Sequence, residues 1–62
     1  MKIEIYNKYW INDMVILSDY PCSVYCNVRN IEITQNFIYG NINGEQLTIK
    51  KDCLNYAYFI LG

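Results

Sequence analysis

Histidine is absent from this 62-residue chain, and so is any glycine-rich motif. Histidine is the commonest general acid or base in enzymes and the commonest metal ligand, so its absence argues against both kinds of site. The three glycines, Gly40, Gly44 and Gly62, lie too far apart to form a phosphate-binding loop. We therefore predict no catalytic residue, no metal site and no cofactor, and we interpret the chain as a non-enzyme.

Charge of either sign is scarce. Five cationic residues oppose six acidic ones, which leaves a net charge of −1, and Lys50 and Lys51 are the only adjacent cations. A surface that follows a phosphate backbone needs several clustered cations. No apolar run approaches the ~18–20 residues of a membrane-spanning helix. Nucleic acid is therefore a less favoured partner, and we expect no membrane association.

A complete set of disulfide pairs is also missing, because the chain has three cysteines, Cys22, Cys26 and Cys53. On one strand Cys22 and Cys26 would stand about 13 Å apart, which is too far for a disulfide or a shared metal ion. Residues 1–10 include Lys2 and Lys8 and lack the apolar segment of a secretory signal. We expect reduced, buried thiols and a protein of the bacterial cytoplasm, with a phage gene as one possible origin.

Aromatic residues are what the chain has in abundance, with seven tyrosines, two phenylalanines and one tryptophan. Tyrosine and tryptophan bury area while keeping a polar tip, which suits surfaces that meet another molecule. Ile, Asn, Tyr and Lys together supply 29 of the 62 residues. All four have AT-rich codons, so the base composition of the gene accounts for part of the tyrosine content.

β-Branched and aromatic residues dominate without helical periodicity, so we predict one all-β domain that covers residues 1–62. Strands are expected at residues 2–6, 14–17 and 56–61, with a turn at Asn12-Asp13. Residues 22–33 are predicted to form one long strand whose inward phase slips at Arg29-Asn30 through a β-bulge, or else to break into two strands. Residues 50–55 are predicted to form a short turn that buries Leu54 in the core.

The clearest local signal is the dipeptide Asn43-Gly44. It favours a two-residue type I′ turn, which aligns Ile42 with Glu45 and sets the register of the strands on either side. In this register Ile38, Gly40, Ile42, Leu47 and Ile49 share one face. Phe37 and Tyr39 belong to the opposite face.

Most of the chain resembles SH3-like barrels of the KOW or Sm-like kind. The resemblance rests on the run from Ile11 to Leu17, on the strand Phe37 to Ile42 with Gly40, and on Leu47 to Ile49 followed by a short turn and a last strand. The resemblance implies a small barrel of five or six strands, a scaffold that binds proteins, peptides or nucleic acids. Two features depart from it: Asn12-Asp13 stands where such barrels often have Gly-Asp, and their basic loops are missing. An OB-like barrel or a three-stranded sheet with two added strands are the alternatives.

The predicted binding surface is aromatic. Strand parity points Tyr6, Tyr25, Tyr39, Tyr56 and Tyr58 away from the core and puts Tyr9 and Trp10 in a connection. The residues predicted to contact a partner protein are Tyr9, Trp10, Tyr25, Phe37, Tyr39, Tyr56 and Tyr58. Trp10 is the expected anchor, and the face with Phe37 and Tyr39 is the favoured place for a partner.

Three functional hypotheses follow. The first is a non-catalytic protein-binding module. By size and composition the chain resembles small phage or mobile-element inhibitors of host enzymes or defence systems, anti-CRISPR proteins included. A host protein is then the expected partner. The second is a binder of single-stranded nucleic acid or nucleotides through Lys50, Lys51 and Arg29 beside the aromatic rings. The third is a homodimer or larger homo-oligomer, in which the chain is a self-assembling structural subunit.

Overall fold

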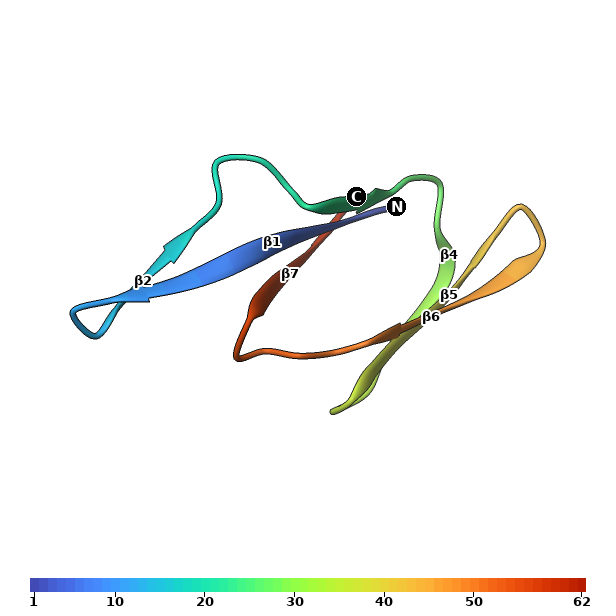
Figure 1. Ribbon diagram of the computed structural model, residues 1–62. Coiled ribbons are helices and arrows are strands. Elements are labelled where there is room, and N and C mark those ends of the chain that lie inside the picture. The colour runs from blue at the N-terminus through green and yellow to red at the C-terminus, as the bar shows by residue number, and fades with distance from the viewer.

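A computed structural model describes residues 1–62, and it is all-β, as predicted (Figure 1). It contains seven strands, one or two more than predicted: β1 Lys2–Ile11, β2 Met14–Leu17, β3 Ser23–Tyr25, β4 Arg29–Ile33, β5 Phe37–Ile42, β6 Glu45–Lys50 and β7 Tyr56–Leu61. They form two open antiparallel sheets, and no strand pairing joins the sheets into one closed barrel. No element is a helix of the length and hydropathy that crossing a membrane requires.

Strand β1 lies at the centre of the first sheet, where the other three strands all pair with it. Its residues Lys2–Asn7 pair with β7 on one edge. Its other edge pairs with β3 near its start and with β2 near its end. The loop between β2 and β3 follows the same edge, because the Ser18 and Cys22 amides donate to the Asn7 and Ile5 carbonyls at 3.0 and 2.7 Å. At ten residues, β1 is longer than any strand that faces it.

The second sheet has the order β4-β5-β6 and contains the predicted hairpin. Asn43 and Gly44 have φ angles of 52° and 80°, as a type I′ turn requires. Ile42 pairs with Glu45, and the rest of the predicted register follows from this pair. The prediction for this hairpin is confirmed at every aligned position.

The segment of residues 22–33 is broken rather than continuous. Its first part, β3, belongs to the first sheet, and its second part, β4, belongs to the second sheet. Asn27 between them has φ 57°, a left-handed conformation that ends the extended chain. The predicted irregularity is also present, because the register of β4 against β5 shifts between Arg29 and Glu32. The single long strand was wrong, and the alternative of two strands is confirmed.

The two sheets enclose a small apolar core. Its five buried residues are Ile3, Ile5, Val28, Ile38 and Ile49. Val28 lies at the corner between the sheets, where its amide donates to the Met1 carbonyl at 2.8 Å and its carbonyl accepts from the Met1 amino group at 3.1 Å. Leu54 is 67% exposed, so its predicted place in the core was wrong. The turn that carries Leu54 lies beside the first sheet and not between the two sheets.

The molecule is elongated, with extents of 43 × 23 × 15 Å. Its radius of gyration is 12.5 Å, against about 11 Å for a compact domain of this length. Its accessible surface of 4720 Å² also exceeds the about 4,200 Å² expected for a folded chain of 7.4 kDa. Figure 1 shows the cause, because the β1–β2 hairpin extends from one end of the body and the β5–β6 hairpin from the other.

Candidate functional site

The β1–β2 hairpin, residues 9–17, extends beyond the rest of the first sheet. Strand β7 and the turn before it accompany β1 only as far as Lys8, whose amide donates to the Asn55 carbonyl at 2.8 Å. Beyond Lys8, β1 pairs with β2 alone. Asn12 and Asp13 close the hairpin with φ angles of 50° and 63°, so the predicted turn is confirmed. The result is a two-stranded ribbon that extends beyond the other strands of the first sheet.

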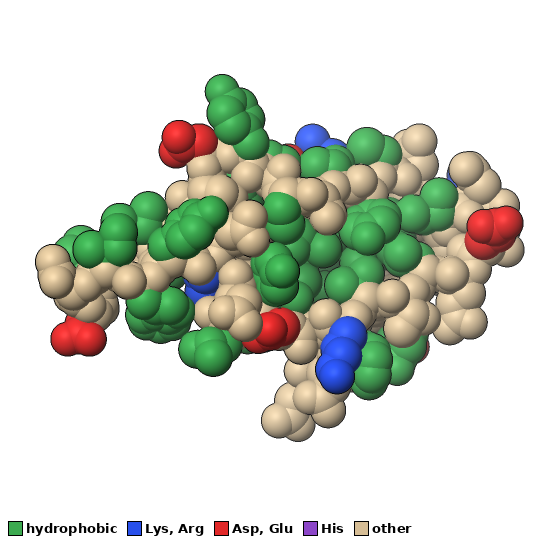
Figure 2. Space-filling view, viewed as in Figure 1, with side chains coloured by type: hydrophobic (Ala, Val, Ile, Leu, Met, Phe, Trp, Pro, Cys, Tyr) green, Lys and Arg blue, Asp and Glu red, His purple; other side chains and the backbone are tan.

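Apolar side chains lie on both faces of this ribbon, and Figure 2 shows hydrophobic side chains gathered at this end of the molecule. Six of them have between 45% and 66% of their surface exposed: Tyr9, Trp10, Ile11, Met14, Val15 and Ile16. Tyr9, Ile11, Met14 and Ile16 share one face and present roughly 450 Å², within the ~300–600 Å² of the largest apolar patch on a typical monomer, and Trp10 and Val15 add a smaller apolar area on the other face. Residues 9–11 and 14–17 include no charged side chain. The hairpin is therefore the most apolar exposed surface of the chain.

One face of the ribbon continues the core face of β1. Ile3 and Ile5 are buried, and two-residue periodicity carries the same face on to Tyr9 and Ile11. Ten residues of β1 span about 33 Å, whereas the six-residue strands of the second sheet span about 20 Å. The second sheet therefore covers only the first half of β1, and the other half of an apolar face is left in solvent.

The opposite face of the ribbon is held by the turn before β7. The indole Nε1 of Trp10 donates to the Leu54 carbonyl at 3.2 Å, and the Lys8 ammonium donates to the Cys53 carbonyl. The turn is itself fixed, because the Asn55 side-chain amide donates to the Asp52 carboxylate at 2.8 Å and lowers the pKa of Asp52. Trp10 thus has a fixed orientation while 56% of its surface stays exposed.

No family model, no curated protein and no solved structure matches this chain. The role of the chain is therefore inferred from the surface of the molecule itself. Of the residues predicted to contact a partner, Tyr9 and Trp10 lie on the exposed hairpin, within β1 and not in the predicted connection, and they point to opposite faces of it.

Tyr25, Tyr56 and Tyr58 do not point away from the core as predicted. They are half-buried and pack against it. In the register of the first sheet Tyr58 lies opposite Ile5, and Tyr25 lies opposite Ile3. Residues directly opposite each other point to the same face of a sheet, so these rings share the face of the two buried isoleucines. The parity assigned to the last strand was wrong.

Phe37 and Tyr39 form a separate aromatic pair on the second sheet. Their rings stack with centroids 5.7 Å apart, and both residues are half-buried. Their neighbours across β6, Lys50 and Thr48, are polar. This face is a smaller and more polar surface than the hairpin, and it lies on a different sheet from Trp10.

The cations of the nucleic-acid hypothesis do not gather. Lys50 lies opposite Phe37, whereas Arg29 lies opposite Asn41, about 13 Å further along β5. The Lys51 ammonium donates to the Thr34 carbonyl at 3.3 Å. The three cations therefore form two separate positions and not one basic patch.

The three cysteines are exposed, so the prediction that they are buried was wrong. Cys22 precedes β3, Cys26 follows it, and Cys53 lies in the turn before β7, so none of the three is part of a strand. No group of three or more His, Cys, Asp or Glu side chains lies close enough to hold a metal ion.

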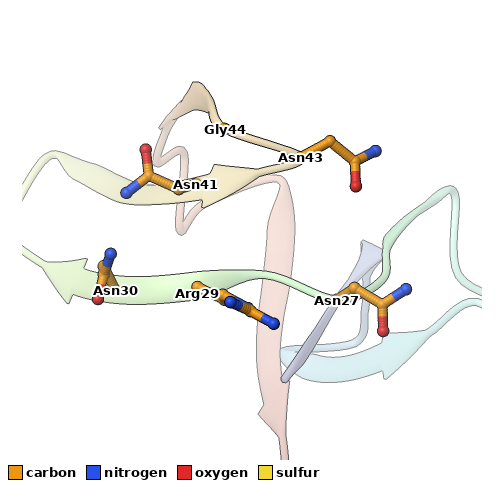
Figure 3. Close-up of a pocket in the computed structure, with 6 residues that line it drawn as sticks. All are labelled: Asn27, Arg29, Asn30, Asn41, Asn43 and Gly44. Atoms are coloured by element: carbon orange, nitrogen blue, oxygen red, sulfur yellow. The ribbon is translucent and has the colours of Figure 1, made fainter.

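A polar hollow of about 730 Å³ lies beside the β5–β6 turn (Figure 3). Its lining residues are Asn27, Arg29, Asn30, Asn41, Asn43 and Gly44. Asn27, Asn30 and Asn43 have positive φ angles, a conformation that favours asparagine for reasons of backbone geometry. Backbone geometry therefore accounts for three of the four asparagines, and Arg29 is the only charged group of the lining.

Proposed function

We propose that this chain is a non-catalytic protein-binding module whose contact surface is the β1–β2 hairpin. The observation that carries the proposal is the set of six half-exposed apolar side chains on a ribbon that extends beyond the strands of both sheets. Aromatic residues and methionine are enriched in protein interfaces, and charged residues are depleted at their centres. The hairpin has this composition, with Lys8, Asp13 and Ser18 at its rim.

Trp10 is the proposed anchor of the interface. Tryptophan is among the residues that most often contribute a large share of binding energy. The hydrogen bond from Trp10 to the Leu54 carbonyl fixes the ring before a partner arrives, which lowers the entropy lost on binding. This favours the hairpin over the Phe37–Tyr39 face as the main contact surface.

Two finer predictions stay proposals. An SH3-like scaffold is supported by the Asn43-Gly44 hairpin and the bent passage from β3 to β4. A host enzyme or defence protein as the partner is supported only by the size and composition of the chain.

The test is capture of a partner from a lysate of the source cells with tagged protein. Trp10→Ala should weaken capture about 30-fold, the effect of losing about 2 kcal/mol at a central anchor. Met14→Lys should weaken capture as well, because it puts a charge among the apolar side chains on the other face of the hairpin. Thr48→Lys, on the other sheet, is the matched control and should bind like the unmodified chain.

Circular dichroism of each variant separates binding from folding. If Trp10→Ala and Met14→Lys fold normally and still capture the same partner as strongly, the hairpin is not the contact surface. If both variants unfold, the rings are structural and the proposal fails.

A further inference from the structure

We propose that two copies of this chain form a dimer by antiparallel pairing of their β2 strands, edge to edge. The inference goes beyond the proposed function, because it concerns the edge of the hairpin and not its faces. Strand β2 pairs with β1 on one side only. Its other edge therefore presents unpaired backbone groups, and such an edge is a template for another strand.

The hydrogen-bond pattern identifies which groups are free. The Ser18 amide donates to the Asn7 carbonyl, so Ser18 faces β1. Alternation along an antiparallel strand then directs the backbone groups of Ile16 and Met14 toward β1. The amides and carbonyls of Val15 and Leu17 point the other way, into solvent.

No residue of β2 blocks this edge. Exposed edges are usually blocked by lysine, proline, a bulge or an inward-pointing charge, or are kept short, and β2 has only the last of these features with its four residues. Met14–Leu17 contains none of these residues, and no register shift interrupts its pairing with β1. An apolar and regular edge of this kind pairs readily with an identical strand.

A two-fold axis perpendicular to the sheet fixes the register. It keeps every side chain on its own face, so a residue can oppose only residues of the same parity. With Ile16 opposite Ile16 of the second copy, Val15 of each copy lies opposite Leu17 of the other. The two Val15–Leu17 pairs are hydrogen-bonded pairs, because the backbone groups of these residues point toward the second copy. The alternative centre at Val15 would oppose Leu17 with Asp13, whose φ of 63° is not extended.

The dimer joins two ribbons into one four-stranded sheet. Tyr9, Ile11, Met14 and Ile16 of each copy then lie on a single face, which doubles the apolar surface offered to a partner. The contact along four residues is small, so we expect a dissociation constant on the order of 10–100 μM. Asp13 of each copy approaches Asp19 of the other, and this repulsion weakens the dimer by about two- to fivefold for each pair at low salt.

Cysteine cross-linking tests the register, in a chain whose three exposed cysteines are replaced by serine. Ile16 and Val15 are both 45% exposed on the same strand, so they make a matched pair. Ile16→Cys brings two Cα atoms to about 4.5 Å across the axis, within the range of a disulfide. Val15→Cys leaves its two cysteines diagonal to each other, about 7–8 Å apart. Under mild oxidation Ile16→Cys should form a covalent dimer much faster than Val15→Cys.

Sedimentation of the unmodified chain should show a monomer–dimer equilibrium, and Asp19→Lys should tighten it at low salt. A monomer at all concentrations up to 1 mM, on the order of ten times the expected constant, overturns the proposal. So does equal cross-linking at positions 15 and 16. Trp10→Ala, which should weaken partner capture, should leave the cross-link at position 16 intact, so the two proposals can fail separately.

Discussion

Replacing Gly40 by alanine should destabilise the chain through a single steric contact. A Cβ atom at this position would lie 2.6 Å from Cγ1 of Val28, well inside the ~3.5–4.0 Å of normal carbon contacts. Val28 is 1% exposed and is fixed at the corner between the sheets, so it has little room to move. Overpacking of this kind costs about 1–3 kcal/mol. Removing a glycine from a strand returns about 0.5–1 kcal/mol, so we expect a net loss of about 1–2 kcal/mol.

The effect should disappear when the obstructing methyl group is removed. Val28→Ala alone leaves a cavity and costs about 2 kcal/mol. In that background the Gly40→Ala substitution should be neutral or slightly stabilising, because Cγ1 is gone. The double-mutant cycle should therefore give a coupling of about 1–3 kcal/mol, far above the ~0.3–0.5 kcal/mol seen for independent sites.

Urea unfolding followed by far-ultraviolet circular dichroism measures each variant, at a concentration low enough to keep the chain monomeric. A domain of this length has a total stability of about 3–9 kcal/mol. With a slope near 1 kcal/mol per molar urea, the Gly40→Ala loss should move the midpoint by about 1–2 M. Gly44→Ala is the control: its φ of 80° makes alanine costly, but no atom lies within 4 Å of the added Cβ. Its cost should be the same in both backgrounds, and equal costs for Gly40→Ala in both would refute the steric explanation.

Two further predictions concern the turn and the core. The Asn55 hydrogen bond lowers the pKa of Asp52 below its ordinary 3.8. The carboxylate therefore stabilises the turn above that pH, and this contribution is lost as the pH falls through the lowered pKa. An acid titration followed by Trp10 fluorescence should show the loss, and Asp52→Asn should abolish the pH dependence. Ile38→Ala removes a core side chain that is 1% exposed and should cost about 2–5 kcal/mol, which a thermal scan would show as a melting temperature lower by about 10–30 °C, whereas Ile33→Ala at an exposed position should have little effect.

Local signals in the sequence predicted the local structure well. Asn43-Gly44 determined both its turn and the register of β5 and β6, because a type I′ turn leaves no freedom in the alignment of its strands. Strands β2 and β7 also have the predicted bounds. In each case residues close together in the chain carry the information.

Features that depend on distant partners were not predictable in the same way. The face to which Tyr56 and Tyr58 point is decided by their alignment with β1, some fifty residues away in the chain, and a shift of one residue would reverse it. The break between β3 and β4 depends on Asn27 adopting a positive φ, which asparagine permits but does not require.

The exposure of Ile11, Met14, Val15 and Ile16 was missed for a related reason. A strand that is apolar at successive positions normally indicates burial on both faces. Here the covering sheet is too short to reach it, and the length of that sheet is not encoded in the hairpin. The only signal was that residues 9–17 are apolar on both faces in a chain too small to bury them all.

Because β1 is continuous, binding and folding share one element. Its first half supplies Ile3 and Ile5 to the core, and its second half forms the exposed ribbon. A partner that binds the ribbon only in the folded state adds its binding free energy to the stability of the core, about 2.7 kcal/mol at a hundred times its dissociation constant. For a domain with five buried apolar residues this is a substantial fraction of the total. The lifetime of the chain in a cell would then depend on the concentration of its partner, and chains without a partner would be the first to unfold and be degraded.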